Sequence, residues 1–222
     1  MSATVLVLKN KSILIGVLLF TSCIAKQQLK RLPYYNTADF KPHWIDNKER
    51  VRKEITHRIN YFSFTDQDGN TVNKQTVDGK IHVANFFFTT CSSICPEMTL
   101  NLQTLQKKFE KNNDVLLLSY SVTPWIDSVL KLKKYANKYS IQVNKWHLLT
   151  GNTNSIYTLA RQSYFAEETT GYSKDSSEFL HTEHFILVDK QGFIRGIYNG
   201  TLPLETQRLT EDITILLKEK NE

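Results

Sequence analysis

Two apolar runs limit what this chain can fold into more than any other feature of its sequence. Residues 81–88 and 115–122 are rich in β-branched, aliphatic and aromatic side chains, with few polar interruptions. Nearly continuous apolar runs of this length are typical of strands that are buried on both faces of a parallel sheet. Between them, apolar side chains recur at helical spacing, at Met98, Leu102, Leu105 and Phe109. A strand, a crossing helix and a second strand predict an α/β fold.

The rest of the pattern extends this core in a definite order. Asp68-Gly69 separates a β-prone stretch that starts at Tyr61 from a polar return, and this predicts an N-terminal hairpin. Downstream we expect helices over residues 129–139 and 155–164, a strand over 146–150, a hairpin of 185–188 with 193–198, and a closing helix through 209–217. We therefore predict a thioredoxin-like α/β fold, with a central mixed β-sheet flanked by helices and an N-terminal hairpin.

The first 23 residues have the features of an export signal. Lys9 and Lys11 precede an apolar run over residues 13–20, which is too short to span a bilayer. The run ends in Thr21-Ser22-Cys23, which resembles a bacterial lipoprotein cleavage box with Cys23 as the lipidated residue; an uncleaved anchor is the alternative. In either case we expect a membrane-anchored domain in the cell envelope, on the exported (periplasmic or extracytoplasmic) side. The predicted parts are a targeting segment at 1–23, a linker at 24–58 and a folded domain at 59–222.

The net charge of +6 does not indicate a nucleic-acid-binding protein. Residues 1–50 contain eight Lys or Arg and three Asp or Glu, so +5 of the +6 lies in this segment. The rest of the chain is almost neutral and has no Arg-rich stripe with interleaved aromatic side chains. We therefore expect no nucleic-acid partner.

The chemistry of the chain concentrates in Cys91 and Cys95, where the first apolar run passes into the following helix. If Cys23 carries lipid, these are the two remaining cysteines, and such a close exported pair forms a disulfide, a redox couple or a soft-metal site. Pro96 suits the first position of a helix, so we expect Cys95 at or near the N-cap. The helix dipole would then lower the pKa of both thiols. Two converging thiolates favour Cu(I).

The segment Thr89-Thr-Cys91-Ser-Ser-Ile-Cys95-Pro96 resembles the Cys-xxx-Cys-Pro motif of the Sco/SenC family. The resemblance runs from about Tyr61 to the C-terminus and includes residues 179–192, where His181 precedes a predicted strand and a turn that contains glycine. It implies a copper site, for Cu(I) or Cu(II), formed by Cys91, Cys95 and His181, with His184 as the alternative imidazole ligand. It also implies delivery of copper to the dinuclear copper site of cytochrome c oxidase, with subunit II as the recipient.

One part of the family pattern is altered in this chain. Where the family usually has Asp-Pro-Glu-x-Asp after the second strand, this chain has Thr123-Pro-Trp125-Ile-Asp127. Thr123 and Trp125 thus replace two acids, which leaves open any role of those acids near the metal or in docking. Copper binding by two thiolates and an imidazole needs neither acid.

The main alternative function is that of a thiol-disulfide oxidoreductase of the thioredoxin type, with Cys91 and Cys95 as its redox pair. Such enzymes usually have a two-residue spacer between the cysteines and a cis-proline before the strand that faces them. This chain has a three-residue spacer and no proline between Pro124 and Pro203. The sequence therefore favours copper binding, although one dithiol could serve both purposes and enzymatic activity stays undecided. We expect His82 and His147 to be packed or hydrogen-bonded, and Met98 to lie in the core.

Overall fold

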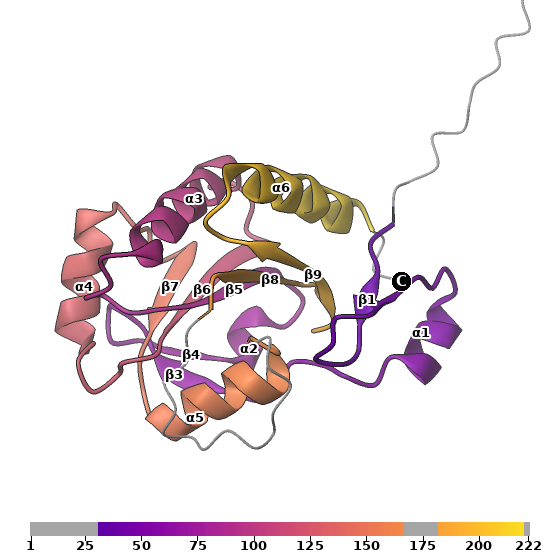
Figure 1. The fold of residues 1–222 in the computed structure, drawn as a ribbon, viewed down its shortest axis with the longest axis horizontal. Helices are drawn as coiled ribbons and strands as arrows, with labels where there is room; N and C mark the ends of the chain where they lie inside the picture. Colours follow the sequence, from indigo (N-terminus) through magenta and orange to yellow (C-terminus); the bar gives the residue numbers. More distant parts are fainter. Residues whose placement is uncertain (1–30, 167–181, 220–222) are drawn as a thin grey trace, which may run out of the picture.

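A seven-stranded mixed sheet forms the centre of the computed structural model, which describes residues 31–166 and 182–219 (Figure 1). The strand order across the sheet is β2-β1-β9-β8-β5-β6-β7. The strands are β1 (Tyr34–Tyr35), β2 (Pro42–His43), β5 (Ile81–Phe87), β6 (Val115–Ser121), β7 (Trp146–Leu149), β8 (His184–Val188) and β9 (Ile194–Asn199). The β5–β6 and β6–β7 pairs are parallel, and the other pairs are antiparallel.

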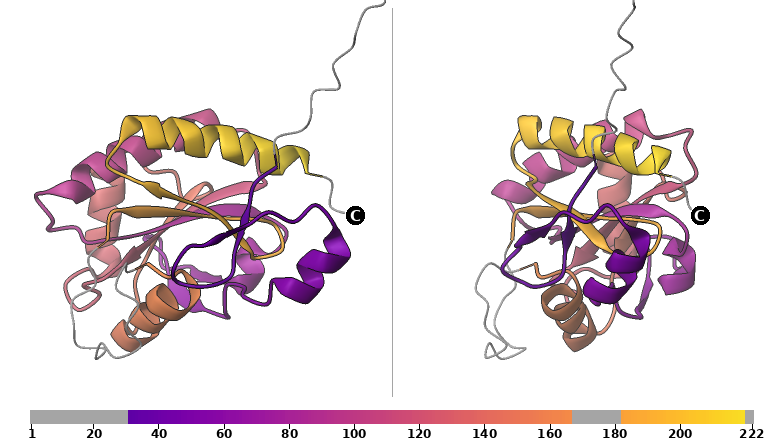
Figure 2. Two further views of the ribbon diagram at one scale, coloured as in Figure 1. Left: turned by 45° about the vertical axis from the view of Figure 1, so that its right-hand side comes forward. Right: turned by 90° about the vertical axis from the view of Figure 1, so that its right-hand side faces the viewer.

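Helices cover both faces of this sheet (Figures 1 and 2). On one face, α3 (Ile94–Lys108), α4 (Val129–Lys138) and α6 (Pro203–Lys218) enclose a core that includes Leu102, Leu132 and Ile213. The other face is covered by α5 (Thr153–Thr158), its π-helical continuation over Leu159–Ser163, and a hairpin of β3 (Ser63–Thr65) with β4 (Thr71–Asn73). The short helices α1 (Lys48–Glu54) and α2 (Lys74–Val77) complete the described part of the chain.

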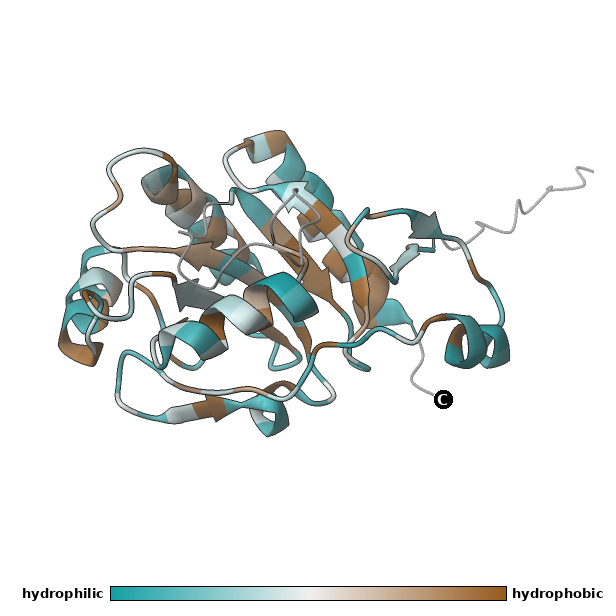
Figure 3. Cartoon of the chain, turned by 60° about the horizontal axis from the view of Figure 1, so that its bottom comes forward, coloured by the Kyte–Doolittle hydropathy of each residue, from teal (hydrophilic) through white to brown (hydrophobic). Residues whose placement is uncertain are grey.

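The two apolar runs form β5 and β6, as the sequence predicts. All seven residues of each strand are buried, because each strand lies between two neighbours and under helices on both faces. Figure 3 shows the same feature as brown, apolar strands inside a shell of mostly polar helices. The prediction of a central mixed sheet flanked by helices, with a hairpin on its N-terminal side, is confirmed.

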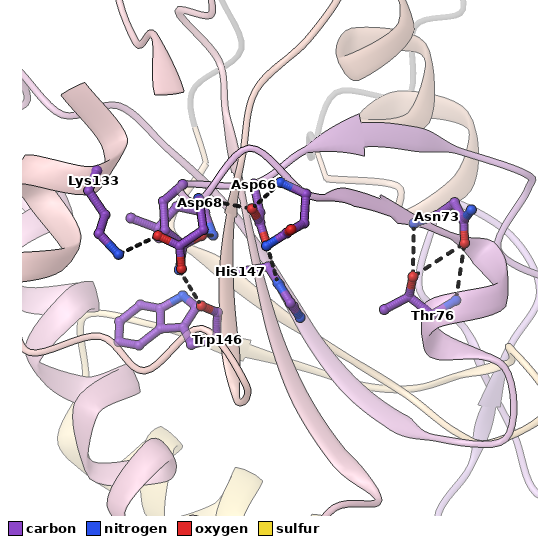
Figure 4. A network of polar contacts seen from close by, with 10 residues as sticks. Asp66, Asp68, Asn73, Thr76, Lys133, Trp146 and His147 are labelled. Atoms are coloured by element: carbon purple, nitrogen blue, oxygen red, sulfur yellow. Dashed lines mark hydrogen bonds and ion pairs between the residues drawn. The ribbon is translucent and has the colours of Figure 1, made fainter. Parts of the chain in front are cut away.

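Polar contacts fasten the β3–β4 hairpin to the edge strand β7 (Figure 4). The Asp66 carboxylate contacts Nδ1 of His147 at 3.1 Å, and Gln67 donates to the Trp146 carbonyl at 2.9 Å. At the tip of the hairpin, Asp68 pairs with Lys133 of α4. Since Asp66 and Gln67 are buried, these contacts satisfy polar groups that would otherwise destabilise the fold.

The structure differs from the linker prediction for residues 24–58. Tyr35 of β1 pairs with Ile194 of β9, so this segment adds strands to the main sheet. Leu32, Val51 and Ile55 are buried. The folded domain therefore extends to at least Leu32, and the boundary predicted at residue 59 lies too far along the chain.

A buried guanidinium holds this N-terminal segment in place. Arg195 of β9 donates to the carbonyls of Leu32 at 2.9 Å and Pro33 at 3.0 Å. The same side chain pairs with Asp189 at 3.0 Å and with Glu219 at 2.9 Å. One cation thus joins the N-terminal segment, the β8–β9 turn and the end of α6.

Helices long and apolar enough to cross a bilayer do not occur among the residues that the structure describes. The predicted targeting segment at residues 1–23, including Cys23, lies outside those residues.

Candidate metal centre

Cys91 and Cys95 lie in the connection between the end of β5 at Phe87 and the start of α3 at Ile94. The Cys91 N–H donates to the Phe88 carbonyl at 3.2 Å, so the chain turns immediately after the strand. The N-cap of α3 is Ser93, which makes Cys95 the second helical residue and Pro96 the third. The helix thus begins two residues earlier than predicted. Proline is tolerated there because the first N–H groups of a helix have no partner within it.

The two thiols differ in exposure and in acidity. Both are free; Cys91 is partly exposed, whereas Cys95 is only 4% exposed. Burial raises the pKa of Cys91, but hydrogen bonds from the Cys95 thiol and from backbone N–H groups at the start of α3 outweigh it and lower that pKa. Burial raises the pKa of Cys95 to about 12. The expectation of two thiolates is therefore wrong for Cys95 in the metal-free chain.

This asymmetry predicts a large difference in alkylation rate. In the reduced chain at pH 8, we expect iodoacetamide to modify Cys91 at least about tenfold faster than Cys95, since one pKa unit changes the thiolate fraction about tenfold. Peptide mapping by mass spectrometry after short reaction times measures both rates. In the matched Cys91→Ser variant, the buried Cys95 should stay slow. Equal rates in the unmodified chain would contradict the asymmetry.

A buried carboxylate anchors the loop that carries Cys91. Asp127 is fully buried and accepts hydrogen bonds from the Thr89 N–H at 3.1 Å and from the Thr89 hydroxyl. Ser121 and Thr123 donate to the same carboxylate, at 2.7 Å and 3.1 Å. The Cys91 loop is thereby fastened to the connection between β6 and α4.

The contacts of Asp127 give a structural role to one of the two replacements in the family pattern. Thr123 donates a hydrogen bond to the Asp127 carboxylate, which an ionised acid at this position could not do. Trp125, the other replacement, is 63% exposed and takes no part in these contacts. The sequence analysis named Asp127 but did not find its role as a hydrogen-bond acceptor. The nearby hydroxyl-bearing residues Ser121 and Thr123 could have indicated that role.

The structure argues against His184 as a metal ligand. Its ring packs edge-to-face against Phe40, with the ring centroids 6.4 Å apart. The next residues along β8 alternate: Phe185 belongs to the core that contains Cys95, and Ile186 belongs to the core on the other face. Because alternate residues of a strand point to opposite faces, His184 lies on the Ile186 side, away from Cys95.

His181 lies outside the described residues, so the structure brings together two of the three expected ligands, Cys91 and Cys95. In residues 31–166 and 182–219, no three His, Cys, Asp or Glu side chains are arranged to hold a metal ion.

The other soft or imidazole candidates have the structural roles that the sequence predicts. Met98 is 1% exposed in the α3 core, and His147 contacts Asp66. His82 is buried with its Nε2 3.1 Å from the Tyr164 hydroxyl, and burial lowers its pKa to about 3.

The lowered pKa of His82 predicts acid sensitivity. Between pH 6.5 and about 3 the imidazole is protonated in the unfolded chain and neutral in the folded chain, so stability is lost as the pH falls. From pH 7 to pH 5 this group should cost roughly 2 kcal/mol of unfolding free energy. Urea titrations should show a smaller loss over this range in His82→Gln, which keeps a partner for Tyr164. An equal loss in both proteins would exclude His82 as the cause.

Fold and site together define a thioredoxin-like α/β protein with a free dithiol at the start of a helix. The sequence matches the SCO1/SenC family over residues 51–218, and the chain belongs to that family. A curated relative, the SCO1 protein homolog of Bacillus subtilis (strain 168), is 34% identical over 154 residues, which cover 68% of this chain and 79% of the relative.

Solved structures of this family share the fold. A SCO1/SenC family lipoprotein from Bacillus anthracis str. Ames has 30% identity and a TM-score of 0.64, over 75% of this chain and 99% of that chain. BsSco is a member of the Sco family of cytochrome c oxidase assembly proteins, and a disulfide switch was identified in it. It has 31% identity and a TM-score of 0.62, over 74% of this chain and 95% of that chain. Arabidopsis thaliana ScoI with copper bound has 24% identity and a TM-score of 0.53, over 70% of this chain and 97% of that chain. At this identity the likeness shows the fold alone. The thioredoxin-like prediction is confirmed.

Proposed function

We propose that this protein binds copper through Cys91, Cys95 and His181. The observation that carries the proposal is the pair of free thiols, one partly exposed and one buried, in the turn from a buried strand into α3. Thiolates are the ligands that Cu(I) prefers, and an added imidazole also suits Cu(II). Copper is bound in a solved structure of the same fold, which supports copper as the metal.

The difference between the two thiols indicates an order of binding. Cys91 is accessible and the more acidic thiol, so it is the group that first meets an incoming copper ion. Cys95 ligates after losing its proton, because a metal ligand must be deprotonated. Release then occurs by ligand exchange with thiolates of similar softness on the recipient.

As the recipient we propose the dinuclear copper site in subunit II of cytochrome c oxidase. The description of BsSco as a member of a family of cytochrome c oxidase assembly proteins supports this choice. For the tether we propose lipid at Cys23, with the domain on the exported side of the membrane. The Bacillus anthracis relative, which is described as a lipoprotein, supports the tether.

Anaerobic titration with Cu(I) in the presence of a chromophoric chelator tests the proposal. The full chain in detergent should remove one Cu(I) per chain from the chelator. The chain in which Cys91 and Cys95 have been alkylated is the control and should remove none. Retention of one tightly bound copper by the alkylated chain, or no binding by the reduced chain, would refute the site.

A second function, reduction of a protein disulfide, is favoured by the reactive thiol at Cys91. Its thiolate would attack a target disulfide, and Cys95 would resolve the mixed disulfide. Two electrons and two protons pass to the target thiols, and a Cys91–Cys95 disulfide forms. The disulfide switch identified in BsSco supports this candidate. If the chain binds no copper but rapidly reduces a test disulfide, the reductase function is the better description.

A further inference from the structure

A pocket of about 490 Å³ lies at one end of the described domain, between the N-terminal segment, α1, the β8–β9 turn and the end of α6. Its inner wall is apolar and includes the buried side chains of Leu32, Val51, Ile81 and Phe193. The right-hand view of Figure 2 faces this end of the molecule, with α1 and the end of α6 in front.

The rim of this pocket is strongly basic. Seven Lys or Arg and three Asp or Glu line it, which gives a net charge of +4. Arg195 is neutralised by Asp189 and Glu219, and Lys190 pairs with Asp114 outside the pocket.

Three rim cations have no carboxylate partner in the part of the chain that the structure describes: Arg52 on α1, Arg58 in the segment that follows, and Lys218 at the end of α6. Arg58 is positioned by a ring contact, with its guanidinium carbon 4.3 Å from the centre of the Phe193 ring. Unpaired cations around an apolar cavity suit a ligand with an anionic head and an apolar body.

We propose that this pocket binds an anionic phospholipid of the membrane that carries the chain. Arg31, the first described residue, lines the pocket, so the described domain is joined at this end to the segment that holds the proposed lipid attachment at Cys23. Each basic residue near an anionic membrane surface contributes about fivefold in affinity. The basic rim, the apolar wall and the position of Arg31 at the pocket all favour an anionic phospholipid as the ligand.

Such a contact would orient the dithiol away from the membrane. Ile81, which lines the pocket, is the first residue of β5, whereas Cys91 follows the other end of that strand. A seven-residue strand spans roughly 20 Å. Figure 1 shows α1 at one end of the molecule and α4, whose preceding loop anchors the Cys91 segment, at the other. Lipid in the pocket would thus present Cys91 and Cys95 to a recipient beyond the membrane surface.

Two exposed tryptophans report this orientation. Trp44, beside the pocket residue Ile45, is 67% exposed, and Trp125, in the loop that anchors the Cys91 segment, is 63% exposed. The full chain is placed in nanodiscs of phosphatidylcholine alone or with phosphatidylglycerol, each with bromine in the upper acyl chain as a quencher. Trp125→Phe isolates the emission of Trp44, and Trp44→Phe isolates that of Trp125; the buried Trp146 is the shared background.

We expect preferential loss of Trp44 emission in the discs that contain phosphatidylglycerol, with Trp125 emission unchanged. Reversing the three rim charges, by Arg52→Glu, Arg58→Glu and Lys218→Glu, should return Trp44 emission to its level in neutral discs. Reversal of the exposed Lys107, Lys108 and Lys134, which do not line the pocket, is the control of equal net charge.

Equal quenching of Trp44 in neutral and anionic discs, or quenching of Trp125 as strong as that of Trp44, would overturn the proposal. The proposal would also be overturned if Trp44 emission changed equally in the rim variant and the control variant. Should the rim variant fail to fold, soluble dihexanoyl lipids provide the test with the rim intact. Phosphatidylglycerol should shift the Trp44 emission, while phosphatidylcholine and inorganic phosphate should not; a shift with phosphate alone would indicate a simple anion site and overturn the lipid assignment.

Discussion

Cys91→Ser and Cys95→Ser are each expected to lower the Cu(I) affinity of the chain by more than about a hundredfold. A hydroxyl is a poor ligand for a soft ion, and even changes to groups that only support a ligand typically cost 10–100-fold in metal affinity. The two variants should therefore lose copper to a chelator that the unmodified chain withstands. Competition titrations at a fixed chelator concentration measure the loss.

The neighbouring Ser93→Ala supplies a matched control for these variants. Ser93 is the N-cap of α3 but makes no side-chain capping hydrogen bond, so its hydroxyl has no structural contact to lose there. This variant should bind copper like the unmodified chain. If Cys91→Ser and Cys95→Ser bind as tightly as Ser93→Ala, the two sulfurs are not the ligands.

Arg195→Met is expected to remove about 3–5 kcal/mol of unfolding free energy, the range found when one partner of a buried ion pair is deleted. Asp189 is 4% exposed and would be left as a buried, unpaired carboxylate. The carbonyls of Leu32 and Pro33 would lose their donor as well. Urea unfolding of the variant and the unmodified chain at pH 7 measures the difference.

The pH dependence of that loss identifies its cause. Burial already raises the pKa of Asp189, although Arg195 opposes the shift. Without the guanidinium this pKa rises further, so the carboxyl takes up a proton in the folded chain as the pH falls. The deficit of Arg195→Met should then be smaller at pH 4.5 than at pH 7. Arg50→Met, which removes an exposed partner of Glu54, should change stability little at either pH. A pH-independent deficit would exclude an unpaired Asp189 as its cause.

Apolar patterning predicted the central sheet because β5 and β6 are buried on both faces, so nearly every residue must be apolar. The same reasoning missed residues 32–58 as part of the domain. Strands β1 and β2 have two residues each, too few for periodicity to be seen. The segment is held in part by Arg195, a charged residue far along the chain, and such contacts leave no local pattern.

The sequence located the candidate site but not the state of its thiols. The spacing of Cys91 and Cys95 and the position of Pro96 identified the site, because both are local features of the sequence. The high pKa of Cys95 depends on burial under the α3 core, which only the packed fold determines. Likewise, the anchoring of Thr89 by Asp127 joins residues 38 positions apart.

The central claim is a copper site formed by two cysteine sulfurs and the His181 imidazole. X-ray absorption at the copper edge is its most direct test. The Cu(I)-loaded full chain should show two sulfur ligands and one nitrogen ligand. We expect the nitrogen contribution to disappear in His181→Ala and to stay in His184→Ala, since His184 lies on the other side of the sheet from Cys95. A spectrum without two sulfur ligands, or a nitrogen contribution that survives in His181→Ala and disappears in His184→Ala, would contradict the proposed site.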